Sequence, residues 1–187
     1  MPTHQSLGGA SDEELLQRMV ATHAERFDAA FWAFFDARVG RRLPPRPVVL
    51  DLGCGPGLLL RDLGERHPDA VLHGYDVTPA MIAYGRQLVF KPTRVTLELH
   101  DVVARPLPLA AAGAHLVSMS SVLHVFDEPL PTLAEIRRVL APGGIFLLND
   151  WVRQALSTYI AYRRDVMKES GPEALRRAFR LFPVHSK

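Results

Sequence analysis

One acidic residue followed by spaced glycines gives this chain its clearest chemical signal. Residues 48–57 read Val-Val-Leu-Asp-Leu-Gly-Cys-Gly-Pro-Gly, so Asp51 precedes Gly53, Gly55 and Gly57. Glycine adopts positive φ readily and has no Cβ to keep a ligand away from the backbone. The helix-like apolar run 58–63 follows at once, so the loop offers free N–H groups at a helix N-terminus. The segment is therefore typical of a nucleotide-binding turn between a strand and a helix.

The carboxylate of Asp51 narrows the kind of ligand that this turn would take. A pyrophosphate would be repelled by an acid at the strand end, whereas a ligand with a cationic amino-acid end would be attracted. The spacing Asp-x-Gly-x-Gly-x-Gly also differs from the Gly-x-Gly-x-x-Gly pattern of dinucleotide sites in its last interval. Both features argue against an NAD-dependent oxidoreductase, which we keep as the less favoured alternative.

The decapeptide resembles the first motif of the class I S-adenosylmethionine-dependent methyltransferases, and further motifs follow in that family's order. Asp76 ends a second expected strand, 70–75, at 19 residues past Gly57. A third expected strand, 95–102, carries Asp101 near its end, and a fourth spans 115–122. The turn 138–144, Arg-Val-Leu-Ala-Pro-Gly-Gly, is characteristic of small-molecule methyltransferases of this class and leads into a fifth strand, 145–148. The resemblance covers roughly residues 45–150.

This resemblance implies a Rossmann-like α/β fold, with a mostly parallel sheet and helices on both faces, and S-adenosylmethionine as the methyl donor. It implies that Asp76 binds the ribose hydroxyls, that Val77 and Met81 flank the adenine, and that Asp101 accepts a hydrogen bond from the adenine amine. Cys54 is a small filler of the loop, because no base is spaced to activate it. The expected cofactor-binding residues are Asp51, Gly53, Cys54, Gly55, Gly57, Asp76, Val77, Met81, Asp101, Val102 and Ser120.

The regions on either side of the core 45–150 read as helical. Residues 1–44 are expected to form a helical lid, which begins with a capping box between Ser11 and Glu14. The aromatic residues at 27, 31 and 35 share one helical stripe, typical of a buried face. In the alternative interpretation the lid closes over the methyl acceptor, and the residues that border the acceptor are Phe31, Trp32 and Trp151.

The C-terminal residues 151–187 are expected to form helices of the same domain. The family's strand order is 3-2-1-4-5-7-6, but we find no room for the hairpin of the last two strands between Arg180 and Lys187. Either the chain is a shortened form or these strands are absent, which leaves the fifth strand as a sheet edge. A homodimer that pairs such edges is the other solution.

Methyl transfer from a sulfonium is an in-line displacement, so the protein mainly aligns the reactants and excludes water. A base is needed only where the acceptor carries a proton that must leave. His124, just past the fourth strand, is the candidate catalytic base, since histidine titrates near neutrality. The alternative is that His124 packs beside the methionine moiety or binds a backbone group. The spacings of the histidines do not form a metal site.

The composition is that of a globular protein, and we expect a cytoplasmic location. A formal net charge of +2 gives no sign of a nucleic-acid partner, and 48% hydrophobic with 22% charged residues is typical of a globular domain. No apolar run approaches a membrane span, and the N-terminus does not read as a signal peptide. The fourth strand is not followed by an Asn-Pro-Pro-Tyr type motif, which leaves O-, N- or C-methylation of a small molecule. A non-catalytic or inactive cofactor-binding protein is the main rival.

Overall fold

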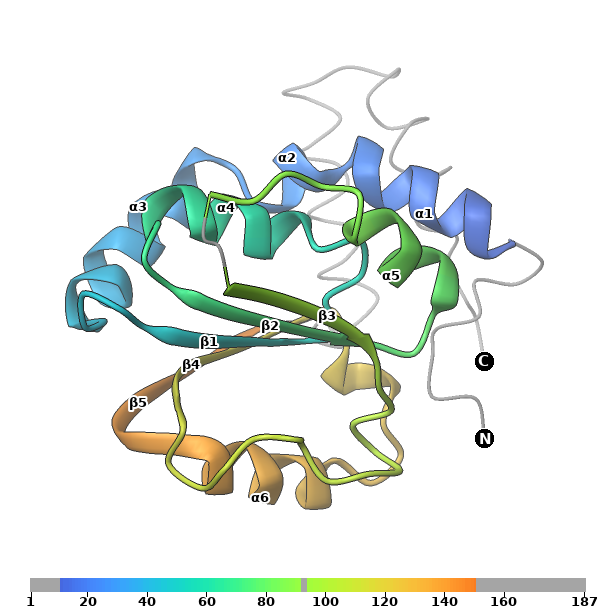
Figure 1. Cartoon of the computed structure of the whole chain (residues 1–187). Coiled ribbons are helices and arrows are strands. Elements are labelled where there is room, and N and C mark those ends of the chain that lie inside the picture. Colours follow the sequence, from blue (N-terminus) through green and yellow to red (C-terminus); the bar gives the residue numbers. More distant parts are fainter. Residues whose placement is uncertain (1–10, 92–93, 151–187) are drawn as a thin grey trace, which may run out of the picture. The chain divides into compact units, whose positions relative to one another are not determined.

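A central sheet of five parallel strands organises the protein (Figure 1). The computed structural model describes residues 11–91 and 94–150, all within one compact unit. The strands are β1 (Val48–Leu52), β2 (Val71–Asp76), β3 (Arg94–Leu99), β4 (Ala114–Ser120) and β5 (Leu140–Asn149). Their order is β3-β2-β1-β4-β5, so the direction of the order reverses between β1 and β4. The predicted Rossmann-like fold is confirmed, and such a reversal is where open α/β sheets bind ligands.

Helices cover both faces of the sheet, but unequally (Figure 1). One face carries α1 (Asp12–Ala21), α2 (His23–Arg26), α3 (Ala29–Arg38), the short η1 (Gly40–Arg42), α4 (Leu58–Arg66) and α5 (Pro79–Gly85). The opposite face carries α6 (Pro129–Val139) and η2 (Leu123–Val125). Because both faces are covered, the central strands are apolar on both sides rather than alternating with polar residues.

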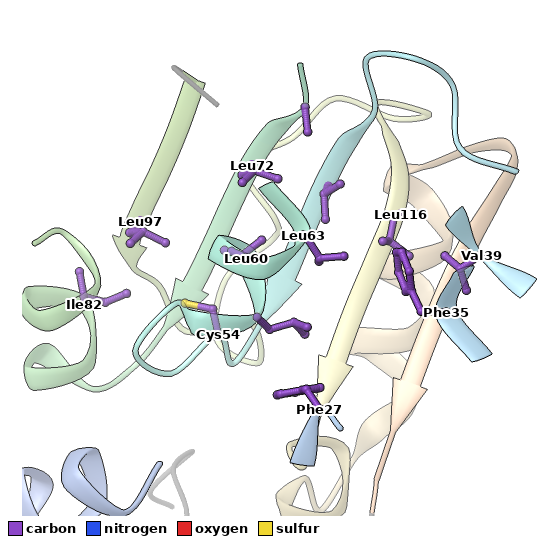
Figure 2. Packing of buried hydrophobic residues seen from close by; sticks show 13 residues of the cluster. Phe27, Phe35, Val39, Cys54, Leu60, Leu63, Leu72, Ile82, Leu97 and Leu116 are labelled. Atoms are coloured by element: carbon purple, nitrogen blue, oxygen red, sulfur yellow. The ribbon is translucent and has the colours of Figure 1, made fainter. Parts of the chain in front are cut away.

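Two hydrophobic clusters fix the sheet between these layers. The cluster under α3, α4 and α5 includes Phe35, Leu60, Leu72, Leu97 and Leu116, as Figure 2 shows. The cluster under α6 includes the residues Leu50, Leu52, Val117, Met119, Ile136 and Val139. Full burial of one such side chain contributes about 1.5–3 kcal/mol. These clusters hold the carboxyl ends of β1 and β4 in place, and those ends carry the site.

The helical N-terminal region begins as the sequence predicts. Ser11 and Glu14 form the capping box: Glu14 N donates to Ser11 Oγ at 3.2 Å, and Ser11 N donates to Glu14 Oε2 at 2.8 Å. The helical region is divided into α1, α2 and α3, and Asp28 caps α3 by accepting a 2.8 Å hydrogen bond from Phe31 N. Phe27 and Phe35 are buried, as expected of a helix face turned to the core.

Several strand boundaries differ from the sequence-based prediction, most of all at β3 and β5, and β4 ends at Ser120 instead of residue 122. β3 ends at Leu99, because Asp101 Oδ1 accepts hydrogen bonds from Val103 N and Ala104 N and so turns the chain. β5 begins at Leu140, since Ala114 pairs with Leu140 across an irregular register that absorbs the expected turn. Helix α6 was not anticipated. The expected helices after residue 150 and the missing hairpin lie outside the described residues.

Candidate functional site

The glycine loop between β1 and α4 requires glycine for two physical reasons. Gly53, Gly55 and Gly57 have φ values of 68°, 53° and 76°, in the left-handed region that other residues avoid. A Cβ on Gly55 would lie 2.5 Å from Met19 Cε, and one on Gly53 would overlap the Val122 side chain. The loop is therefore packed tightly between α1 on one side and the segment after β4 on the other.

Asp76 organises this loop through its carboxylate. Its Oδ2 accepts a 2.8 Å hydrogen bond from Gly55 N, and its Oδ1 accepts one of the same length from Thr78 N. Thr78 is the N-cap of α5, but its side chain makes no capping hydrogen bond. Each carboxylate oxygen keeps a second lone pair. Asp76 therefore braces the turn and can still accept a hydrogen bond from a ligand hydroxyl.

Asp51 lies at the carboxyl end of β1 and is 3% exposed. Its Oδ1 accepts a 2.7 Å hydrogen bond from Ser118 Oγ on β4. The pKa of Asp51 is raised to about 7: burial raises it most, the Ser118 hydrogen bond opposes this, and the charge of Asp76 raises it while that of Arg26 lowers it. A cation placed beside Asp51 would therefore recover a large desolvation cost.

A small pocket opens beside Asp51 and is covered by the N-terminal helices. Its lining includes Met19, His23, Arg26, Asp51, Gly53 and Ser120. The free volume is about 20 Å³, which is room for one or two water molecules. The Met19 side chain of α1 lies over Gly55, so it must move aside before a ligand can approach the backbone of the glycine loop at this point.

Arg26 brings a cation into the pocket, and sequence reasoning missed it. Its Nη2 donates a 2.9 Å hydrogen bond to Met19 O, while its buried Nε has no partner among the described residues. Burial lowers the pKa of Arg26 and the charge of Asp51 opposes this, but a guanidinium stays protonated in a protein. Ser120 Oγ is also buried without a partner in the described part of the chain. A carboxylate, a guanidinium and a free hydroxyl in one pocket fit the zwitterionic end of an amino acid.

Helix α2 is tied to α4 by an ion pair. His23 Nε2 lies 2.6 Å from Asp62 Oδ2, and Arg61 Nη2 donates to Asp62 Oδ1 at 2.9 Å. Burial of Asp62 would raise its pKa, but the hydrogen bonds from His23 and Arg61 hold it below the usual value. The contact between His23 and Asp62 holds α2, which covers the pocket, against α4.

His124, the candidate base, lies in η2 beyond β4. Its Nδ1 is 2.6 Å from Asp150 Oδ1, and its backbone N donates to Asp150 Oδ2 at 3.0 Å. Val122, two residues earlier, packs against Gly53. His124 thus lies at the same edge of the sheet as Asp51, which the sequence predicted, while its carboxylate partner was not foreseen.

The other predicted cofactor residues lie along the same edge. Met81 and Val102 are buried, while Val77 is half-buried. Cys54 is 6% exposed, and burial raises the pKa of its thiol well above the ordinary value, which fits a filler and not a nucleophile. Across residues 11–91 and 94–150, no group of three or more metal-ligating side chains is found.

Two of the residues expected at the acceptor pack elsewhere. Phe31 and Trp32 lie against the cluster under α3 and α4, and Arg66 sits 4.1 Å above the Trp32 ring. Phe27 lines the pocket instead. Trp151 lies outside the described residues.

Within the described part of the chain, no helix is both long and apolar enough to cross a membrane.

Comparisons with known proteins identify the family. A family model described as a methyltransferase domain matches residues 49–144, just over half of the chain. The chain is 34% identical over 116 residues to the malonyl-[acyl-carrier protein] O-methyltransferase of Hahella chejuensis, a match that covers 58% of this chain and 38% of that protein. The chain spans about two fifths of the length of the first curated relatives it matches.

Solved structures share the fold. An S-adenosylmethionine-dependent methyltransferase from Aquifex aeolicus superposes with a TM-score of 0.61 at 22% identity, over 78% of this chain and 76% of that one. The [4+2]-cyclase SpnF superposes with a TM-score of 0.55 at 24% identity, over 66% and 46% of the two chains. At these identities the likeness shows the fold alone. The motif resemblance and the matched family model agree: the chain belongs to the methyltransferase-domain family of class I S-adenosylmethionine-dependent methyltransferases.

Proposed function

We propose that this chain binds S-adenosylmethionine in the pocket beside the glycine loop and transfers its methyl group to a small-molecule acceptor. The observation that carries the proposal is the pairing of Asp51 with Arg26 in the lining of one buried pocket. Asp51 would take the ammonium of the methionine moiety, and Arg26 with Ser120 would take its carboxylate. Charge-assisted hydrogen bonds of this kind are about twice as strong as neutral ones.

The nucleoside would extend from the pocket along the carboxyl edge of β2 and β3. Asp76 would accept hydrogen bonds from the ribose hydroxyls while it keeps the bonds from Gly55 N and Thr78 N. Val77, Met81 and Val102 would contact the adenine, and Asp101 would accept from its amine. These assignments follow the sequence resemblance and agree with the burial of Met81 and Val102.

The protein's own contribution to the reaction would be alignment and exclusion of water. Positioning of two reactants can supply roughly 7–11 kcal/mol of the barrier reduction. Helices α1 and α2 cover the pocket, so they would shield the reacting atoms once the ligand has entered. His124 is our candidate base for an acceptor that must lose a proton. Of the residues proposed to border the acceptor, Phe31 and Trp32 would need to leave their present packing, and Phe27 is better placed.

Turnover is the necessary test, because the same fold occurs in a cyclase. The purified chain would be given S-adenosylmethionine with a radioactive methyl group and a panel of small hydroxyl, amine, thiol and carboxylate compounds. The proposal predicts S-adenosylhomocysteine together with labelled acceptor in wild type, and neither product with Gly55→Val. Tight binding of S-adenosylhomocysteine without transfer to any acceptor would instead support the rival, a non-catalytic cofactor-binding protein.

The cellular location, the partners and the oligomeric state are predictions from composition and sheet topology. We propose a cytoplasmic location, no nucleic-acid partner, and a homodimer as one way to cover β5, which lies at the edge of the sheet formed by the described residues. Sedimentation at several concentrations tests the dimer. Retention on RNA that falls steeply with salt would contradict the absence of a nucleic-acid partner.

A further inference from the structure

The carboxylate of Asp150 holds one residue at two points. Its Oδ1 lies 2.6 Å from His124 Nδ1, and its Oδ2 accepts a 3.0 Å hydrogen bond from the backbone N of the same residue. The two contacts fix both the position of His124 and the plane of its ring. The side chains are 24% and 11% exposed, so the protein shields the pair from most of the solvent.

This double contact selects one form of the imidazole. An ionised carboxylate only accepts hydrogen bonds, so the proton of a neutral ring must sit on Nδ1. Nε2 then keeps its lone pair and points away from the carboxylate. A histidine held this way, with its other nitrogen bonded to an acid, is the arrangement that prepares a general base.

The pair stands at the edge of the sheet where the ligand is proposed to bind. Asp150 directly follows β5, and Ser121 N donates a 2.8 Å hydrogen bond to Asn149 O, which fastens the segment after β4 to the end of β5. Val122 of the same segment packs on Gly53 in the cofactor loop. The ring of His124 is therefore supported from the end of β5, and it lies two residues along the chain from the side chain that packs on the loop proposed to hold the methyl donor.

We propose that Asp150 is a positioning residue that holds His124 ready to deprotonate the acceptor, and that the acceptor is a hydroxyl compound. The inference rests on the proposed methyl transfer. In the step, His124 Nε2 takes the hydroxyl proton as the acceptor oxygen bonds to the methyl carbon. The bond from that carbon to sulfur breaks, and its electron pair stays on sulfur. The sulfonium thereby becomes a neutral thioether, and S-adenosylhomocysteine leaves. His124 then returns its proton to water.

The need for a base separates hydroxyl acceptors from carboxylates. A carboxylate with a pKa of about 4 has already lost its proton near neutral pH and needs no base. An alcohol or phenol keeps its proton under the same conditions. A histidine oriented by an acid at this edge is therefore useful for a hydroxyl acceptor and superfluous for a carboxylate.

The tautomer of His124 gives a test that does not require turnover. Nitrogen NMR of the imidazoles, with His124 assigned by its loss in His124→Gln, reports which ring nitrogen carries the proton. We expect the Nδ1–H form in wild type and a shift toward the Nε2–H form in Asp150→Asn. A wild-type ring protonated on Nε2 would overturn the inference even if methyl transfer is observed.

Kinetics test the role in the reaction. Asp150→Asn should lower kcat for hydroxyl acceptors by about 10²-fold or more, with KM and the affinity for S-adenosylhomocysteine within about twofold of wild type. Asp150→Glu should restore part of the rate. The double variant His124→Gln/Asp150→Asn should be no slower than His124→Gln, because the two residues act as a unit. Asp127→Asn, an exposed acid three residues past His124, is the matched control and should keep the wild-type rate.

The outcomes separate this inference from the proposed function. A chain that methylates carboxylates but no hydroxyl compound upholds methyl transfer and overturns the inference, as does Asp150→Asn with the wild-type kcat. Absence of transfer to every acceptor overturns both. Full loss of S-adenosylhomocysteine binding in Asp150→Asn would show that the pair merely supports the fold, which also contradicts a positioning role.

Discussion

Ser118 Oγ on β4 donates a 2.7 Å hydrogen bond to Asp51 Oδ1 on β1, and this bond joins the two strands at the point where the order of the sheet reverses. Asp51 is 3% exposed, and the groups of the described chain that favour its charge are this hydroxyl donor and the more distant guanidinium of Arg26. The carboxylate is therefore costly to keep ionised until a cation arrives. The pH dependence of stability and of binding should both report this cost.

The unfolding free energy should depend on pH through Asp51. Its pKa is about 7 in the folded chain against 3.8 for an unperturbed aspartate, so between these values the folded state holds a proton that the unfolded state releases. The contribution to stability is full below about pH 4 and is lost as pH rises through about 7. A difference of about 3 in pKa corresponds to roughly 4 kcal/mol. The test is urea unfolding of wild type and Asp51→Asn from about pH 4.5 to 8. As pH rises, the unfolding free energy of the variant should increase relative to that of wild type by up to this amount. Unfolding free energies that change with pH in the same way in both proteins would contradict the assignment.

Binding of S-adenosylhomocysteine should release a proton near neutral pH. An ammonium beside Asp51 favours the ionised carboxylate, so the pKa of Asp51 falls in the complex. The affinity should then rise by up to about tenfold per pH unit below pH 7 and level off above it. Calorimetry in two buffers of different ionisation heat counts the released proton. In Asp51→Asn this release should disappear, and its persistence would place the proton elsewhere.

Arg26→Gln should weaken S-adenosylhomocysteine binding without unfolding the chain. A hydrogen bond to a charged group is worth about 1.5–3 kcal/mol, which is roughly 10- to 150-fold in affinity. Adenosine has no amino-acid end, so its affinity should be unchanged. Arg38→Gln, on the exposed side of α3, is the control for a lost positive charge. Equal losses for both ligands would show that Arg26 acts only by supporting α2.

Gly55→Ala should weaken cofactor binding, and a second glycine separates the effect of an added methyl group in the loop from that of backbone strain. A Cβ at Gly55, where φ is 53°, would project to the side of the loop that the Met19 side chain now covers and that the cofactor would approach, whereas Gly143 has a φ of 77° with no atom within 4 Å of a Cβ. The left-handed conformation itself costs about 1–2 kcal/mol for a residue with a side chain. Gly143→Ala should therefore lose stability but bind normally. Normal binding by Gly55→Ala would refute the glycine-loop site.

The sequence was sufficient for the fold and for one side of the site. The order of strands was implied by the resemblance to the family. The glycine loop, Asp51 and the place of His124 followed from local patterns, because a strand, a turn and a helix N-terminus are encoded by neighbouring residues. Arg26 and Asp150 could not be found this way. Arg26 comes from a four-residue helix, and Asp150 meets His124 only because β5 lies beside β4. Arg26 shares a pocket with Asp51, and Asp150 meets His124, only through the packing of segments that are distant in the sequence. No spacing in a single sequence indicates such contacts.

The acceptor side was predicted less well for the same reason. The stripe of Phe27, Phe31 and Phe35 was correctly interpreted as a buried face, but Phe27 alone of these lines the pocket. Phe31 and Trp32 were expected at the acceptor from their chemistry, and they pack against the hydrophobic cluster under α3, α4 and α5 instead. Aromatic residues serve cores and pockets equally well, so their type does not tell the two apart.

Thermal unfolding with S-adenosylhomocysteine, with NAD and with neither tests the central claim most directly. A ligand at about 100 times its dissociation constant stabilises the folded state by about 2.7 kcal/mol. For a domain of this size that is a rise in Tm of roughly 5–10 °C. The account predicts this rise with S-adenosylhomocysteine alone, and its loss in Arg26→Gln. No rise with S-adenosylhomocysteine, or an equal rise with NAD, would contradict the assignment of this pocket to the methyl donor.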